Sequence, residues 1–361
     1  MARCWQMLAA LASLLGGATW AGPTILYVSE SGDNRIAVYR MDESTGELTR
    51  GAAVELPGPP GSLAMSADRG RLYAAVRSVQ QFATLAVDRK TGLLSDPVMA
   101  PAGCNASYLH VDKTGNWLLA AAYKENLITV SRIKNGVLEG GPVTTLHAGE
   151  KPHCVQTDPS NRFALVPHVG AENKVEQLRF DAAAGTLAPN EPPSMAGGEG
   201  QRPRHMQFHP NGRWVYLVNE QGKSVTLCDF NAKAGTLTIR QTVPTVPSDW
   251  DPSQGNCADI HISADGRFAY ASNRGHDSLA IFSIDRNTGE LTPRGQTPTE
   301  KTPRSFCLMP PDENFVVAGG EGSHRLIVYR RDPQAGTLAP LRTYDCGKAP
   351  AWLLGVKYSD D

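Results

Sequence analysis

The sequence predicts an all-β fold, a seven-bladed β-propeller closed into a ring, and three observations lead to this prediction. First, 35 glycines and 26 prolines are spread along the 361 residues, which is typical of many short strands joined by turns. Second, each end of the chain carries an incomplete repeat that the other end can complete. Third, the tripeptide Gly-x-Leu recurs at intervals of 44 to 54 residues, at Gly46, Gly92, Gly136, Gly185, Gly235, Gly289 and Gly336.

A repeat of this length corresponds to one four-stranded propeller blade, and seven copies fit the chain. Each repeat has an apolar strand, a tight turn, a second strand rich in β-branched or aromatic residues, a polar loop and a third strand before Gly-x-Leu. In the fifth repeat we expect these strands over residues 204–209, 214–218 and 224–230. In the sixth repeat we expect them over residues 260–263, 268–272 and 278–284.

The two ends of the chain complement each other. The first repeat opens at Ile25 to Ser29, which has the pattern of a second strand, so the strand before it is missing. The segment from Ala351 to Val356 follows Pro350 and has the pattern of a first strand, with the same proline-led opening as Pro152 and Pro303. We expect this segment to complete the first blade and close the ring, because closure removes exposed strand edges. Residues 24–361 then form one domain without a linker.

The N-terminal segment differs in kind from the rest of the chain. Arg3 is followed by an apolar run from Met7 to Leu15 and then by small residues up to Gly22. This order is that of a signal peptide over residues 1–23. The apolar run is too short for a membrane-spanning helix, which needs about 20 residues. We expect an exported protein, periplasmic or secreted; the alternative is a mis-assigned start codon and a cytoplasmic protein.

Composition and missing motifs exclude several classes of function. The 35 basic and 36 acidic residues are evenly mixed and give a net charge of −1, which argues against nucleic-acid and membrane partners. No Gly-x-Ser-x-Gly elbow, P-loop, His-Glu-x-x-His or Gly-x-Gly-x-x-Gly motif occurs, so we expect neither serine catalysis nor a nucleotide cofactor. We expect no cofactor and no metal, since His205, His209 and His261 lie in first strands, where packing is the ordinary role, without regular ligand spacings.

The cysteines show no pairing pattern. Cys4 lies in the expected signal peptide, and the sequence has no Cys-x-x-Cys. A chain of this length does not need disulfides to fold, and several cysteines lie within apolar strand patterns. We therefore expect mostly free thiols at Cys104, Cys154, Cys228, Cys257, Cys307 and Cys346.

Propeller geometry indicates where chemistry can take place. The start of the first strand and the end of the second strand of every blade lie at the same mouth of the channel. His153, Arg204 and Arg304 begin first strands, while Arg77, Tyr123, Glu220 and Arg274 end or follow second strands. A cationic site with one carboxylate and one imidazole suits a small anionic substrate whose reaction needs proton transfer.

Three pairs of motifs carry a resemblance to a known family. They are Gln201-Arg-Pro-Arg-His205 with Val218-Asn-Glu220, Ala258-Asp-Ile-His-Ile262 with Ser272-Asn-Arg274, and Thr302-Pro-Arg304 with Ala318-Gly-Gly320. Residues 24–358 resemble the lactonase family of seven-bladed propellers, which contains bacterial 6-phosphogluconolactonases and fungal carboxy-cis,cis-muconate lactonising enzymes. The resemblance implies His153, Arg204, Glu220 and Arg274 as catalytic residues, and Arg304 and Arg77 as residues that bind substrate. Tyr123, placed at the same mouth by blade geometry, is also expected to bind substrate. One departure is His168, where relatives often have an acidic or small residue.

The resemblance and the residue types together predict hydrolysis of a sugar lactone, with 6-phosphoglucono-1,5-lactone as the nearest family substrate. Either Glu220 or His153 serves as general base and the other as proton donor, while Arg204 and Arg274 hold negative charge. Because phosphorylated sugars are cytoplasmic, an exported protein could act on an unphosphorylated aldonolactone. The alternatives are a muconate cycloisomerase and a non-catalytic propeller that serves as a binding module. We expect a monomer.

Overall fold

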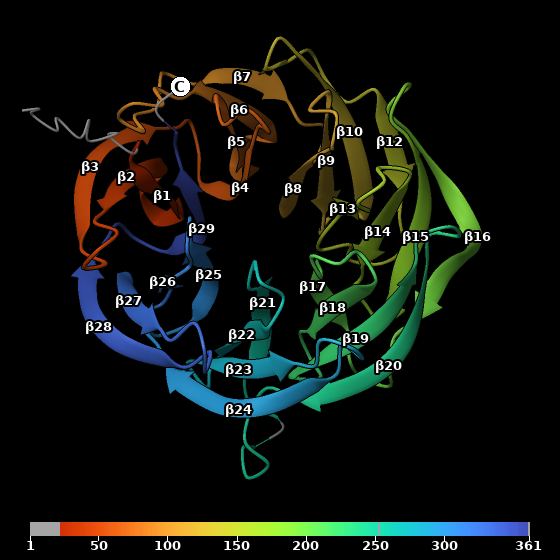
Figure 1. Cartoon of the computed structure of the whole chain (residues 1–361). Coiled ribbons are helices and arrows are strands. Elements are labelled where there is room, and N and C mark those ends of the chain that lie inside the picture. Colours follow the sequence, from red (N-terminus) through yellow and green to blue (C-terminus); the bar gives the residue numbers. More distant parts are fainter. Residues whose placement is uncertain (1–21, 252, 360–361) are drawn as a thin grey trace, which may run out of the picture.

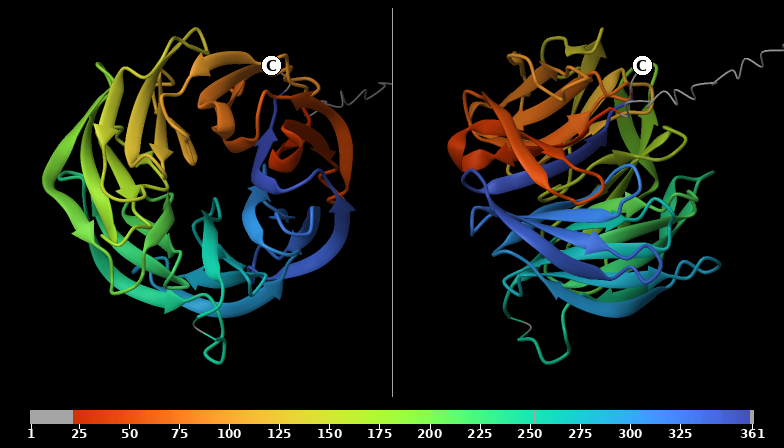
Figure 2. Two further views of the ribbon diagram at one scale, coloured as in Figure 1. Left: turned by 180° about the vertical axis from the view of Figure 1, so that it is seen from behind. Right: turned by 60° about the vertical axis from the view of Figure 1, so that its left-hand side comes forward.

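Seven antiparallel sheets are arranged in a ring, seen face-on in Figure 1 and from behind in Figure 2. The computed structural model describes residues 22–251 and 253–359, so nearly all of the expected signal peptide lies outside the described residues. Within those residues the only helical turns are η1 (Ser31–Asp33) and η2 (Arg77–Val79), and no helix is long and apolar enough to cross a bilayer. The all-β propeller prediction is confirmed.

Six blades follow one another along the chain from inner to outer strand. Blade 2 has β4 (Pro60–Met65), β5 (Arg71–Val76), β6 (Gln81–Ala86) and β7 (Val98–Pro101); blade 3 has β8 (Tyr108–Val111), β9 (Trp117–Ala122), β10 (Leu127–Lys134), β11 (Val137–Leu138) and β12 (Thr144–His147). Blade 4 has β13 (Gln156–Thr157), β14 (Phe163–Pro167), β15 (Lys174–Asp181) and β16 (Thr186–Ala196). Blade 5 has β17 (Pro203–Phe208), β18 (Trp214–Asn219), β19 (Ser224–Asn231) and β20 (Thr236–Pro244). Blade 6 has β21 (Asn256–Ile262), β22 (Phe268–Arg274), β23 (Ser278–Ile284) and β24 (Leu291–Pro298); blade 7 has β25 (Pro303–Met309), β26 (Phe315–Gly320), β27 (Arg325–Arg331) and β28 (Leu338–Asp345).

Blade 1 joins the two ends of the chain. Its inner strand is β29 (Pro350–Lys357), followed outward by β1 (Thr24–Glu30), β2 (Arg35–Met41) and β3 (Leu48–Glu55). β29 and β1 are antiparallel, with Thr24 opposite Lys357. The C-terminal segment therefore supplies the missing strand, as the sequence predicts, and closes the ring.

Blade 3 departs from the simple four-strand pattern. The position of its outer strand is shared by β11 and β12, which both pair with β10. Gly140 and Gly141 separate the two pieces, and Gly140 has a positive φ of 71°. The chain turns outward there, so the outer edge of this blade is interrupted while its inner strands keep their order.

Apolar side chains fill the spaces between blades. The buried residues form seven clusters, each of which joins two neighbouring blades. Second strands are buried on both faces; all six residues of β18, for example, are buried. A strand of this kind reads as a continuous apolar run, which explains the valine-rich and alanine-rich second strands of the sequence.

The Gly-x-Leu repeat marks the turn between the third and fourth strands of each blade. All seven glycines have a positive φ, between 70° and 78°, which residues with a side chain adopt only at a cost. At Gly235 a Cβ atom would also overlap the ring of Phe163 in the preceding blade. In several blades this turn also receives a hydrogen bond from a buried tyrosine, as where Tyr216 Oη donates to Gly289 O over 2.7 Å. The repeat is therefore a contact between blades as well as a turn.

Candidate active site

Inner strands begin with a distortion that directs side chains toward the channel mouth. In β17, Pro203 lies opposite Asn219 and His205 opposite Val218, which leaves Arg204 as an extra residue without a partner. In β25, Arg304 is the extra residue in the same way. A β-bulge of this kind changes the direction of the side chain at the bulge. Two of the four arginines that the sequence predicts for the site are thus placed by matching bulges in blades 5 and 7.

The residues just before the inner-strand prolines have a left-handed backbone. This conformation costs a residue with a side chain about 1–2 kcal/mol, so its repetition at one mouth of the ring is a marked feature. The φ angles are 57° at Lys151, 55° at Arg202, 60° at Thr302 and 51° at Ala349. Four residues with a strained, left-handed backbone therefore lie at the mouth that holds the candidate site.

A small cavity at this mouth collects the predicted site residues. Its lining includes four of them, together with His205 and Trp352 from inner strands; the four are Arg77, His153, Arg204 and Arg304. Tyr123, which follows β9, contacts His153 edge to face with ring centroids 5.7 Å apart. Glu220 and Arg274 join the group through ion pairs described next. The structure therefore brings all seven predicted residues to one mouth.

Glu220 pairs with an arginine on each side. Glu220 Oε2 lies 3.0 Å from Arg204 Nε, and Glu220 Oε1 lies 3.4 Å from Arg274 Nη2. Arg274 also donates from Nη2 to the backbone oxygen of Cys257 over 3.0 Å. Both carboxylate oxygens are engaged, and the three side chains form a pair of positive charges around one negative charge.

His153 is buried beside these charges and is held neutral. Burial, and after it the positive charges of Arg204 and other neighbouring arginines, keep the pKa of His153 well below its usual range. Its Nδ1 atom is buried and has no hydrogen-bond partner in residues 22–251 and 253–359. A buried polar atom without a partner is costly, and such atoms call for a functional explanation. A neutral imidazole with an unengaged nitrogen is able to accept a proton.

The arginines make the mouth strongly positive. Burial together with the charges of Arg274 and Arg304 lowers the pKa of Arg204 to about 9, so its guanidinium stays charged at neutral pH. Burial, with Arg304 nearby, also lowers the pKa of Arg77. Arg77 Nε donates to Asn105 Oδ1 over 3.1 Å. An anion bound at this mouth would offset the mutual repulsion of these charges, which makes the cavity suited to a phosphate or carboxylate group.

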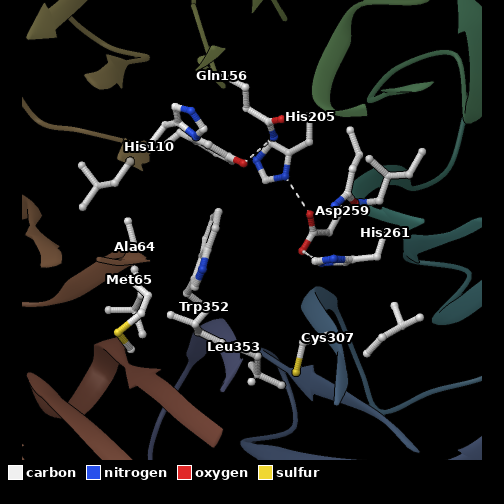
Figure 3. Close-up of a pocket in the computed structure, with 18 of the residues that line it drawn as sticks. Ala64, Met65, His110, Gln156, His205, Asp259, His261, Cys307, Trp352 and Leu353 are labelled. Atoms are coloured by element: carbon white, nitrogen blue, oxygen red, sulfur yellow. Dashed lines mark hydrogen bonds and ion pairs between the residues drawn. The ribbon is translucent and has the colours of Figure 1, made fainter. Parts of the chain in front are cut away.

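A larger cavity of about 390 Å³ lies in the channel on the other side of His205 and Trp352 (Figure 3). Most of its polar groups are engaged in contacts within the protein. Gln156 Nε2 donates to Tyr108 Oη and to Met206 O, each over 2.8 Å. Since few of its polar groups are free to meet a substrate, size alone does not make this cavity the active site. Within the described part of the chain, no group of three or more metal-binding side chains is present.

Several neighbours of the site were not predicted. Glu321 follows β26 as Glu220 follows β18, and its Oε2 lies 3.7 Å from Arg304 Nη1. The rule that second-strand ends face the mouth would have found Glu321. The sequence predicts a packing role for His205 and no site role for Trp352, yet both line the two cavities. No sequence signal distinguishes them from other inner-strand residues, because the direction of an inner-strand side chain depends on the bulge before it.

The sequence matches the family described as "Lactonase, 7-bladed beta-propeller" over residues 27–354. The chain belongs to this lactonase family. The match covers all seven blades and includes each of the seven site residues.

Relatives of this lactonase-family chain span nearly its full described length. It is 31% identical over 329 residues to the 6-phosphogluconolactonase of Serratia proteamaculans (strain 568), covering 91% of this chain and 98% of the relative. It is 32% identical over 329 residues to that of Yersinia pseudotuberculosis serotype O:3 (strain YPIII), covering 91% and 96%. The solved structure of the Pseudomonas aeruginosa periplasmic gluconolactonase PpgL superposes with a TM-score of 0.85 at 24% identity, covering 93% of this chain and 100% of that one, and shows the same fold.

His168, the position at which we expect this chain to differ from its relatives, lies next to the site of this lactonase propeller. His168 is buried and pairs through its backbone with Pro152, the residue before His153. Its Nδ1 atom donates to Glu150 O over 3.0 Å, and its Nε2 lies 3.6 Å from Glu176 Oε2. His168 does not line the site cavity, so any effect of this residue on substrate choice would act through the segment that carries His153.

Proposed function

We propose that this chain hydrolyses a sugar lactone by metal-independent acid/base catalysis, with 6-phosphoglucono-1,5-lactone as the nearest family substrate. One observation carries the proposal: the neutral, buried His153 imidazole, with an unengaged Nδ1, shares a cavity with the guanidinium groups of Arg77, Arg204 and Arg304. The cavity thus has a proton acceptor beside groups that stabilise an oxyanion, which ester hydrolysis needs. The names of the curated relatives support the same reaction.

The two candidate bases are not equivalent in this geometry. Both oxygens of Glu220 face arginines, whereas His153 Nδ1 has no partner among the described residues. We therefore assign the general base to His153. It takes a proton from the attacking water as the new C–O bond forms at the lactone carbonyl. It then gives this proton to the ring oxygen as the ring C–O bond breaks, which leaves a hydroxy acid.

Glu220 has a different role in this proposal. It holds Arg204 and Arg274 in place while leaving the site with a net positive charge. The two guanidiniums stabilise the oxyanion of the tetrahedral intermediate. A bound anionic substrate also raises the basicity of His153, because its charge opposes the arginine field that disfavours the imidazolium.

The phosphate or carboxylate of the substrate would bind to Arg77 and Arg304, which line the cavity and are not paired with Glu220. Among the described residues the ion-pair partner of Arg304 is Glu321, at 3.7 Å, and a single partner of this kind leaves other guanidinium donors for a ligand. Arginine recognises such groups through two parallel hydrogen bonds, which lysine does not provide. Tyr123, packed on His153, would contact the sugar ring.

We also propose that the protein is exported and acts as a monomer. The signal-peptide pattern of residues 1–23 and the periplasmic location named for PpgL support export. An exported enzyme would meet unphosphorylated aldonolactones more readily than phosphorylated ones. N-terminal sequencing of the protein from a periplasmic fraction tests the cleavage, and uncleaved protein in the cytoplasm would overturn it.

Lactone hydrolysis by the purified protein is the decisive experiment. The substrates are 6-phosphoglucono-1,5-lactone and glucono-1,5-lactone, corrected for spontaneous opening, with His153→Gln as the inactive control. We expect turnover by the wild type that the variant lacks, and the ratio of the two substrates shows whether phosphate is required. No rate above background on either lactone would overturn the proposal. A rate on a carboxymuconate substrate would then indicate a cycloisomerase, and no rate on any substrate a binding module.

A further inference from the structure

A series of side chains in polar contact with one another extends from Arg204 to the large cavity. Arg204 Nη1 lies 3.1 Å from His205 Nε2, and His205 Nδ1 lies 2.9 Å from Asp259 Oδ1. The other carboxylate oxygen, Asp259 Oδ2, lies 3.4 Å from His261 Nε2. Figure 3 shows His205, Asp259 and His261 in this order, with the dashed line between the first two.

The direction of each hydrogen bond in this series follows from the groups at its two ends, the Arg204 guanidinium and the Asp259 carboxylate. A guanidinium only donates, so His205 Nε2 must accept from Arg204 and carry no proton. The proton of the neutral imidazole is then on Nδ1, where Asp259 accepts it. Asp259 thereby selects the tautomer of His205 that is able to bind Arg204.

Asp259 is suited to this task because it stays ionised although it is buried. Its Oδ1 atom accepts a second hydrogen bond, from the backbone nitrogen of Ile260, over 3.0 Å. Burial alone would raise its pKa, but hydrogen bonds and charges from His261 and His205 lower the pKa far below the usual range. The negative charge of this buried carboxylate also stabilises the charged form of Arg204, against the repulsion from Arg274 and Arg304.

Arg204 is held on several sides by these contacts. Nη1 also donates to the backbone oxygen of Ala258 in blade 6, and Nε faces Glu220. Because Nη1 and Nε are occupied in this way, Nη2 is the nitrogen through which Arg204 would meet an oxyanion. We infer that Asp259 and His205 are positioning residues that orient Arg204 toward the substrate, an assignment that rests on the proposed function of Arg204.

Two substitutions at one position separate orientation from packing. In His205→Gln the side-chain oxygen takes the place of Nε2 and still accepts from Arg204, whereas in His205→Asn the shorter amide does not reach it. We expect kcat/KM for the better lactone to fall about 10- to 100-fold in His205→Asn and less than about 3-fold in His205→Gln. The control is His209→Asn, which removes a hydrogen bond from Nε2 to Gly266 O between the same two blades. Equal losses in all three variants would overturn the inference.

A double-mutant cycle tests whether the effect passes through Arg204. Arg204→Lys keeps the charge but not the two Nη1 contacts. We expect Asp259→Asn to lower kcat/KM about 10- to 100-fold in the wild type and less than about 2-fold in Arg204→Lys. If the two substitutions instead lower kcat/KM independently, so that their fold-losses multiply in the double variant, the role of Asp259 is purely structural and the inference is overturned. If Asp259→Asn does not fold, His205→Asn takes its place in the cycle.

The tautomer of His205 is measurable without turnover. Two-bond 1H–15N correlation spectra of protein labelled with 15N-histidine, assigned with His205→Gln, should show a proton on Nδ1 and none on Nε2. A proton on Nε2 in the wild type would overturn the inference whatever the enzyme does. If the spectrum is as expected but no lactone is hydrolysed, the proposed function fails, while the contact between His205 and Arg204 stands.

Discussion

Arg204 and Glu220 lie side by side on two strands of one blade, with Nε 3.0 Å from Oε2, and Glu220 reaches Arg274 of the next blade with its other oxygen. The carboxylate therefore fixes the spacing of two guanidiniums across a blade boundary. Its negative charge also offsets the repulsion between the two arginines.

Replacement of Glu220 tests this arrangement. We expect Glu220→Gln to lower kcat/KM at least about 100-fold, because two oxyanion-binding groups lose their alignment. The free energy of unfolding should fall by about 3 kcal/mol, as buried charge is left without its partner. The control is Glu47→Gln, whose exposed ion pair with Arg342 contributes at most about 1 kcal/mol. Denaturant unfolding measures both variants, and equal losses would contradict the prediction.

The pH dependence of catalysis should reflect the low pKa of His153. Because burial and the arginines disfavour its imidazolium, His153 is already unprotonated at neutral pH. We therefore expect kcat/KM for glucono-1,5-lactone to change little as the pH falls from 8 to the ordinary histidine pKa of about 6.5, and to decline only below it. Initial rates corrected for spontaneous opening measure this profile. A midpoint above about 6.5 would show that His153 is not the base.

Stability should fall when the pH drops below about 6.5. The folded protein keeps His153 and His205 neutral, and burial and Arg204 lower the pKa of His205 to about 4, whereas unfolded histidines titrate near 6.5. Below pH 6.5 the unfolded chain binds more protons, so each histidine removes up to about 1.4 kcal/mol per pH unit, and for His205 this ends near pH 4. Urea unfolding at pH 7.5, 6.0 and 5.0 tests this, with His205→Gln reducing the slope. Constant stability over that range would be the contrary result.

Arg77 and Arg304, the two cavity arginines that do not pair with Glu220, should determine the preference for a charged substrate. We expect Arg304→Met to raise KM for 6-phosphoglucono-1,5-lactone about 10-fold or more, because a charge-assisted hydrogen bond to phosphate contributes about 1.5–3 kcal/mol. KM for glucono-1,5-lactone should change less than about 3-fold. Arg77→Met should act in the same direction. An equal rise for both lactones would place the phosphate elsewhere, and Arg330→Met, away from the mouth, serves as the control.

Thiol titration should find free but unreactive cysteines. The six cysteines from Cys104 to Cys346 are all free, and burial raises the pKa of each, to about 11 for Cys104 and about 12 for Cys346. A protonated, buried thiol reacts slowly. We expect six thiols per cleaved chain in denaturant without reductant, and slow reaction of the folded protein. Fewer than six would reveal a disulfide.

Much of the fold follows from the sequence because the propeller is a local repeat. The positive φ that Gly235 and its six equivalents require makes glycine recur at each outer turn, so blade number and phase are visible in the chain. The first and second strands of blade 5 end within a residue of their expected bounds. The interruption of blade 3 at Gly140 was not foreseen, because a Gly-Gly pair within an outer strand resembles an ordinary turn.

The site was predictable to the extent that it depends on blade geometry. Strand ends brought Arg204, Glu220 and Arg274 to the same mouth, as expected. The link from His205 to Asp259 was not foreseen, because it joins inner strands of two blades whose relative register depends on separate bulges. Sequence patterns within one blade carry no information about that register.

Because β29 closes the ring, the same ring of blades could be built from a chain that begins at a different blade. Thr24 and Lys357 lie opposite each other in one sheet, so a short peptide is able to join the described ends. New ends opened between Gly140 and Gly141, where both residues are exposed and lie outside the strands, would leave every inner strand intact. In such a circular permutant, blade 1 would consist of consecutive residues, and every blade would keep the same two neighbours in the ring.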